Sequence, residues 1–189
     1  MTLIVSENIE EVENNLKTGN IFCPLCNEPL RPHGHARTRF VNSLDKTLLK
    51  IRPRRGRCSS CGNTHVLLPD ILLVRRAHTV EVIGLVLLDK SQGNSLRSIS
   101  DDRNLSFSTV KGWIKRFRLK ADQIKNMFLF AAFKSDPNLN NISPSGSPFK
   151  DAINAIGIAL MSLRLRIGEI SSWSTVSMIS KGELLFNTS

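Results

Sequence analysis

Two Cys-x-x-Cys pairs constrain what this chain can fold into more than any other feature of its 189-residue sequence. A stretch of 31 residues separates the pairs, which together contain every cysteine of the chain: Cys23, Cys26, Cys58 and Cys61. Four thiolates at such spacing are typical of one tetrahedral zinc site, in which each pair bends sharply so that both sulfurs face the metal. Asn27 and Gly62 directly follow the two pairs, and both residue types tolerate the positive φ of such a turn. The sequence therefore predicts one structural Zn²⁺.

The segment between the two pairs predicts a zinc ribbon. Residues 36–41 and 47–54 alternate in polarity like two strands, and residues 42–46 are the expected hairpin loop. A thioredoxin-type redox centre would need a βαβ pattern, which the sequence lacks. Four cysteine ligands also leave no open position for a catalytic water. We expect the nearby histidines to lie on the surface or the hairpin rather than on the metal: His33, His35 and His65.

Positive charge is concentrated in the first two thirds of the chain. The net charge is +10, yet residues 1–20 form an acidic leader with a net charge of −3. Residues 21–61 carry a net charge of +7, and residues 62–133 carry +5. This distribution favours a nucleic-acid partner over a basic surface that serves solubility alone.

Four arginines crowd into residues 52–57, directly before the second cysteine pair. A zinc ion with four thiolates has a net charge of −2, so two neighbouring cations at most would balance it. We expect Arg55 and Arg57 at the entrance to the cysteine turn. The remaining positive charge of the hairpin is expected to contact DNA phosphates, through Arg37, Arg39, Arg52 and Arg54.

Residues 79–133 predict a helix-turn-helix domain. A helix over residues 80–92 precedes a short helix over residues 96–102, and a third helix follows over residues 107–118. Asn104 lies in the turn between the last two helices, where it can take left-handed geometry. The expected N-cap residues of the three helices are Thr79, Ser95 and Ser106.

The third of these helices has the pattern of a DNA-recognition helix. Its apolar residues recur at three- to four-residue spacing, and its opposite face is small, polar and basic. In a helix-turn-helix the second helix of the motif enters the major groove with its N-terminal half toward the bases. The predicted DNA contacts are Ser106, Ser108, Thr109, Lys111, Lys115, Arg116 and Arg118. The alternative is an ordinary three-helix bundle with a solvated basic face.

The motifs "CPLC", "RGRCSSCGNTHV" and "SLRSISDDRNLSFSTVKGWIKRF" resemble the N-terminal DNA-recognition region of zinc-ribbon insertion-sequence transposases. Still closer is the resemblance to a family of small uncharacterised bacterial proteins with a tail that carries a Trp and a Gly-x-Leu-Leu element, here Trp173 and residues 182–186. The resemblance implies zinc at the four cysteines and DNA contact from the helix that starts at Ser106. Two residues depart from the usual motif, with Ser100 in place of Ala and Asn104 in place of Gly.

After the third helix the sequence predicts a helix over residues 121–133 and a linker rich in Pro, Ser and Asn over residues 134–149. A C-terminal helical tail over residues 150–189 follows, with its first helix over residues 150–167. The apolar stripe of this helix is expected to pack on the helical core, the alternative being self-association or a partner surface. Carboxylates in this part are scattered, without the strands of the ribonuclease-H-like domain by which such transposases cut DNA. We therefore expect no enzyme.

Taken together, the sequence predicts an α+β protein in which a small zinc ribbon over residues 21–68 precedes the helical domain and tail. We expect a cytoplasmic chain with neither a signal peptide nor a membrane span. Its expected role is to bind double-stranded DNA as a recognition or regulatory protein of a mobile element. One alternative is a DNA-recognition subunit or fragment of a transposase that acts with a separate catalytic subunit. Another is an RNA-binding zinc-ribbon protein, although few aromatic residues are available to stack on bases.

Overall fold

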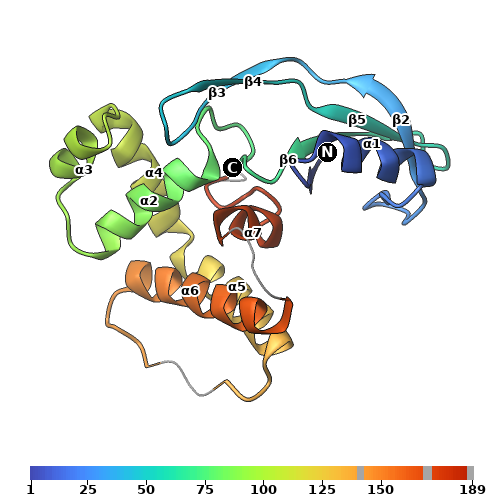
Figure 1. Cartoon of the computed structure of the whole chain (residues 1–189). Coiled ribbons are helices and arrows are strands. Elements are labelled where there is room, and N and C mark those ends of the chain that lie inside the picture. Colours follow the sequence, from blue (N-terminus) through green and yellow to red (C-terminus); the bar gives the residue numbers. More distant parts are fainter. Residues whose placement is uncertain (140–142, 168–171, 187–189) are drawn as a thin grey trace.

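The computed structural model shows a fold of the α+β class, with sheets in the N-terminal third and helices in the rest (Figure 1). It describes residues 1–139, 143–167 and 172–186. Parts of the predicted linker and tail, at residues 140–142, 168–171 and 187–189, lie outside the described residues.

A four-stranded sheet with the strand order β1-β6-β5-β2 carries the cysteines. Its strands are β1 (Thr2–Val5), β2 (Leu30–His35), β5 (Arg54–Cys58) and β6 (Thr64–Pro69). β1 pairs with β6 in parallel, whereas β5 runs antiparallel to both of its neighbours. Helix α1 (Ile9–Thr18) packs on one face of the sheet and forms a small core with it: Val12, Leu16, Cys23, Leu30, Cys58 and Leu67.

Residues 1–20 belong to this sheet domain, and the prediction of a separate acidic leader is wrong. Val12 and Leu16 are one helical turn apart and both are buried, while Glu10 and Glu11 are exposed near the start of the helix. The Asn8 side chain accepts hydrogen bonds from the first turn of α1, as an N-cap residue does. Glu10 and Glu11 therefore lie on the solvent side of an amphipathic helix.

The predicted hairpin is present but is part of a longer one. Its strands are β3 (Arg39–Asn42) and β4 (Leu48–Ile51), which pair antiparallel. The Ala36 N–H donates to the Pro53 carbonyl oxygen at 2.8 Å, which links this pair to the β2–β5 pair. Figure 1 shows the resulting two-stranded ribbon, which runs from the cysteine end of the molecule to α2 and α3. Its inner face buries Val41 against Leu68 and Leu72.

In the described part of the chain, five helices between residues 80 and 167 begin and end close to their predicted positions, and a further one lies in the predicted tail. They are α2 (Val80–Ser91), α3 (Leu96–Asp102), α4 (Phe107–Leu119), α5 (Ala121–Ser135), α6 (Pro148–Ile167) and α7 (Ser172–Ile179). The linker is shorter than predicted, because α5 and α6 each extend into it. No helix among the described residues is long and apolar enough to span a bilayer.

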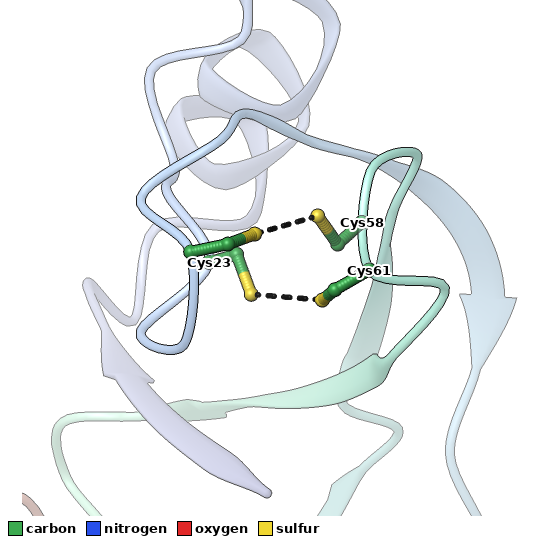
Figure 2. Close-up of side chains that lie close together, drawn as sticks. Cys23, Cys58 and Cys61 are labelled. Atoms are coloured by element: carbon green, nitrogen blue, oxygen red, sulfur yellow. Dashed lines mark hydrogen bonds between the residues drawn. The ribbon is translucent and has the colours of Figure 1, made fainter.

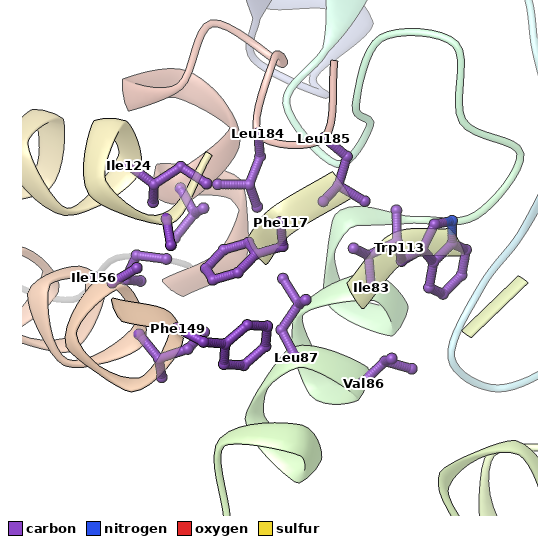
Figure 3. Close-up of a cluster of buried hydrophobic side chains, with 14 of the residues drawn as sticks. Ile83, Val86, Leu87, Trp113, Phe117, Ile124, Phe149, Ile156, Leu184 and Leu185 are labelled. Atoms are coloured by element: carbon purple, nitrogen blue, oxygen red, sulfur yellow. The ribbon is translucent and has the colours of Figure 1, made fainter. Parts of the chain in front are cut away.

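One apolar core joins the helices (Figure 3). Phe117 of α4 meets Phe149 of α6 edge to face, with ring centroids 4.9 Å apart. Ile153 and Ile156 of α6 are buried in the same core, so the predicted packing of this stripe on the helical core is confirmed. The core thereby fixes α4 against the rest of the helical domain.

The C-terminal tail closes this core against the sheet domain. Leu184 and Leu185 are buried among the helices (Figure 3). The Ser177 hydroxyl donates to the Leu72 carbonyl oxygen at 2.6 Å, and the Arg76 guanidinium donates to the Leu185 carbonyl oxygen at 2.7 Å. The tail is therefore an integral part of the fold.

Candidate metal centre and helix-turn-helix surface

Each cysteine pair lies in a tight turn whose backbone follows the predicted pattern. The Asn27 N–H donates to the Cys23 carbonyl oxygen at 2.9 Å, and the Gly62 N–H donates to the Cys58 carbonyl oxygen at 3.1 Å. Asn27 has a φ of 59° and Gly62 a φ of 72°, so both residues take the predicted left-handed geometry. The similar turns aim their sulfurs toward a common point.

Pairing between β2 and β5 brings the two turns together. Leu30, which follows the first turn, lies opposite Cys58, at which the second turn begins. The four Sγ atoms lie within 4.8 Å of one another, and the closest approaches are 3.6 Å between Cys23 and Cys61 and 3.4 Å between Cys26 and Cys58 (Figure 2). Cys23 and Cys58 are buried, whereas Cys26 and Cys61 are exposed. This cluster could hold one metal ion.

The two exposed thiols have opposite acidity. The Asn63 side-chain amide donates to Cys61 Sγ at 3.3 Å and lowers the pKa of this thiol to about 6. The backbone N–H of Glu28 lowers the pKa of Cys26, but hydrogen bonds with the neighbouring thiols and desolvation beside them outweigh it and raise the pKa to about 12. Four thiolates at these distances repel one another, so full ionisation of the cluster requires a bound cation.

His65 is buried beside this cluster, which corrects its predicted place on the surface. Its Nε2 lies 3.4 Å from Cys23 Sγ, and only 1% of the residue is exposed. Burial lowers the pKa of the imidazole, which favours the neutral form. Alternation along β6 places His65 on the same face as buried Leu67, and this signal was available in the sequence. His33 and His35 are exposed, as predicted.

Two of the four hairpin arginines that we expect to contact DNA make contacts within the protein instead. Arg54 forms an ion pair with Glu13 of α1 and donates to the Gly34 carbonyl oxygen at 3.0 Å. Arg39 donates to the Arg76 carbonyl oxygen at 3.1 Å, and burial lowers its pKa. The other two, Arg37 and Arg52, are exposed.

α3 and α4 form a helix–turn–helix arrangement whose turn has the predicted geometry. The Ser95 and Ser106 side chains accept hydrogen bonds from the first turns of the two helices, so both predicted caps are present. Thr79 precedes α2 but makes no such side-chain bond. Asn104 has a φ of 52°, and the Ser100 hydroxyl donates to the Leu105 carbonyl oxygen at 2.6 Å. The two departures from the usual motif therefore both support the turn.

The predicted contact residues gather on the outer side of α4, opposite its buried stripe. The stripe consists of Val110, Trp113, Ile114 and Phe117. Five of the predicted contacts are exposed: Ser106, Ser108, Lys111, Lys115 and Arg118. Thr109 and Arg116 are half-buried. Arg116 folds back over Gly112, where an added Cβ would lie 3.0 Å from its Nη1. Of the predicted hairpin contacts, Arg39 and Arg54 are instead held within the protein.

These features define an α+β protein that combines a four-cysteine candidate metal centre with a helix–turn–helix arrangement. The chain belongs to the family with a domain of unknown function designated DUF6431, whose sequence pattern matches residues 23–120. The matched segment is just over half of the chain and runs from the first cysteine to the residue after α4. No curated protein and no solved structure gives a significant match.

Proposed function

We propose that this protein binds double-stranded DNA through α4, with a zinc-stabilised ribbon beside the helical domain. The observation that carries the proposal is the capped α3–turn–α4 arrangement, which has a basic outer face and a rigidly packed inner face. In such an arrangement the second helix lies in the major groove, where short polar side chains approach base edges and longer basic ones reach phosphates or guanine.

The sulfur distances support zinc as the metal. Zinc–sulfur bonds of about 2.3 Å in a tetrahedron place the sulfurs about 3.8 Å apart, close to the 3.4 Å and 3.6 Å approaches in the cluster. The four cysteines would hold the ion, and hard oxygen donors are not among them. A four-thiolate zinc is structural: it would fix the two turns to each other. The backbone turns and His65 would hold the sulfurs in place.

We place the protein with a mobile element as a recognition or regulatory factor and propose that it does not cut DNA itself. Supporting this, the acidic side chains near α5 and α6 serve local contacts, as when Asp151 accepts from the Ser145 N–H at 2.7 Å. Incubation of the purified chain with a DNA duplex and Mg²⁺ tests this part. Strand cleavage by the chain alone would show that it is an enzyme.

DNA binding is tested with Lys111→Ala and Lys115→Ala, both on the exposed face of α4. We expect each variant to lose about 5- to 100-fold in affinity for a duplex selected from a random pool, because each removes a charged contact to a base or phosphate. Fluorescence anisotropy gives the affinities. Lys134→Ala, an exposed lysine at the end of α5, is the matched control. Unchanged affinity in both α4 variants would exclude this helix as the DNA-binding element. Tighter binding of the wild-type protein to single-stranded RNA than to the duplex would favour the RNA-binding alternative.

A further inference from the structure

The sheet that carries the cysteines has two unlike faces. α1 covers one of them so closely that an added Cβ on Gly56 would lie 3.3 Å from Leu16 Cδ2. Leu30 and Cys58 lie opposite each other on this covered face, and both are buried. Residues next to them in each strand therefore face the other way.

The opposite face presents three arginines. Arg31 and Arg57 are direct partners in the β2–β5 pair, and both are exposed. Directly opposite side chains have Cβ atoms about 4.5–5.5 Å apart. Arg55 lies two residues before Arg57 and therefore shares its face, roughly 7 Å along the strand. We call this set, Arg31, Arg55 and Arg57, the arginine face.

The charges of the arginine face are not balanced within the described residues. Like charges directly opposite each other destabilise a sheet, yet none of the three guanidinium groups makes a hydrogen bond or ion pair with the described part of the chain. Arg55 Nε is also buried without a partner. Arg54, between them in sequence, is by contrast paired with Glu13 on the covered face. The three arginines thus have an arrangement that an external anion would stabilise.

Neighbouring side chains indicate which polyanion fits. Thr64 and Val66 of β6 lie directly opposite Arg57 and Arg55. Both are small and neither is aromatic, so this face offers cations without a ring for unpaired bases to stack on. Closely spaced arginines match a duplex backbone, which carries one phosphate per about 3.4 Å of axis on each strand. Guanidinium groups bind phosphate through paired hydrogen bonds.

From these observations we infer that the arginine face binds the phosphate backbone of duplex DNA, as a sequence-independent contact in addition to that of α4. This inference rests on the proposed function. It assigns DNA contact to Arg55 and Arg57, which the sequence-based division places at the entrance to the cysteine turn.

The double variant Arg31→Ala/Arg57→Ala tests the inference. Its affinity for a labelled duplex is measured by anisotropy over a series of KCl concentrations. The binding constant falls with salt, and each lost phosphate contact makes the plot of log K against log salt less steep by about 0.9. We therefore expect the magnitude of the slope to decrease by about 1 to 2, on specific and unrelated duplexes alike. Lys17→Ala/Lys134→Ala removes the same charge from α1 and α5 and is expected to retain the wild-type slope.

A folding check separates loss of contact from loss of structure. The metal content of Arg31→Ala/Arg57→Ala should equal that of the wild-type protein. Its denaturation midpoint should be unchanged or higher, because two opposed like charges are removed. A wild-type slope in this variant, together with weaker binding by Lys111→Ala, would overturn the arginine face and leave the proposed function intact. Failure of the wild-type protein to bind duplex DNA would overturn both.

Discussion

Neighbouring arginines in β5 have different tasks because a strand alternates its faces. Arg54 points toward α1 and neutralises Glu13, while Arg55 and Arg57 lie on the face away from α1, where Arg57 is directly opposite Arg31. Charge counting treats these residues as one cluster. The fold divides them into a structural pair and an anion-binding candidate.

Alternation along a strand also places His65 beside the cysteine cluster, where it is a positioning residue for Cys23. Replacement by Leu removes the contact of the imidazole Nε2 with Cys23 Sγ and leaves an apolar side chain in the buried site. We expect metal transfer to a chromophoric chelator to be on the order of tenfold faster, since loss of such outer contacts typically weakens metal binding 10- to 100-fold. His65→Gln, which keeps a donor, should restore most of the wild-type rate.

Exposed His33 supplies the control for this experiment. His33→Leu should release metal at the wild-type rate, because the residue has no contact with the cluster. Equal release rates for His65→Leu and the wild-type protein would show that the 3.4 Å contact does not support the site.

At the scale of elements, the packing of the tail helix α7 on α2 depends on one glycine of α2. The Trp173 ring lies on Gly84, where an added Cβ would be 2.1 Å from Trp173 Cε2. Gly84→Ala must therefore displace the indole, and we expect a loss of about 1–3 kcal/mol in the free energy of unfolding, as for other overpacked cores. Chemical denaturation followed by circular dichroism measures the change.

Gly157 of α6 is the matched control, because a Cβ there meets nothing within 4 Å. Gly157→Ala should stabilise the protein by about 0.5–1 kcal/mol, the ordinary difference between glycine and alanine within a helix. A similar loss of stability in both variants would mean that helix backbone effects, rather than contact with Trp173, explain the result at Gly84.

At the scale of the whole molecule, the cysteine cluster and the helical domain have separate apolar cores. The core around Leu16, Leu30 and Leu67 includes Cys23 and Cys58, whereas the core of the helices contains no cysteine. Metal removal with a strong chelator should therefore loosen the core that contains the cysteines before the core of the helices. Structural zinc sites contribute on the order of 10 kcal/mol to the folding of small domains.

Hydrogen–deuterium exchange measures this difference. We expect amides of α1, β2 and β5 to exchange at least about tenfold faster after metal removal, which corresponds to about 1.4 kcal/mol of lost protection. Amides in the middle of α2 and α4 should keep their protection. Uniform acceleration across the chain would instead mean that the two cores unfold as one cooperative unit.

Local rules account for what could be predicted from the sequence. Asn27 and Gly62 mark the cysteine turns, Ser95 and Ser106 cap their helices, and Asn104 takes left-handed geometry, because each depends on a few adjacent residues. Periodic apolar spacing likewise places α2 to α6 to within a few residues. The clustering of the four cysteines is predicted from the spacing within each Cys-x-x-Cys pair and the usual chemistry of zinc.

Features that depend on residues far apart in the chain required the tertiary structure. The parallel pairing of β1 with β6, the contact of Arg54 with Glu13 and the burial of His65 against Cys23 join segments about 40 to 60 residues apart. Which face of a strand is covered depends on where α1 packs, and the acidic composition of residues 1–20 conceals that packing. Composition therefore predicts a polyanionic partner, whereas only the covered and open faces of the sheet distinguish the arginines available to bind it.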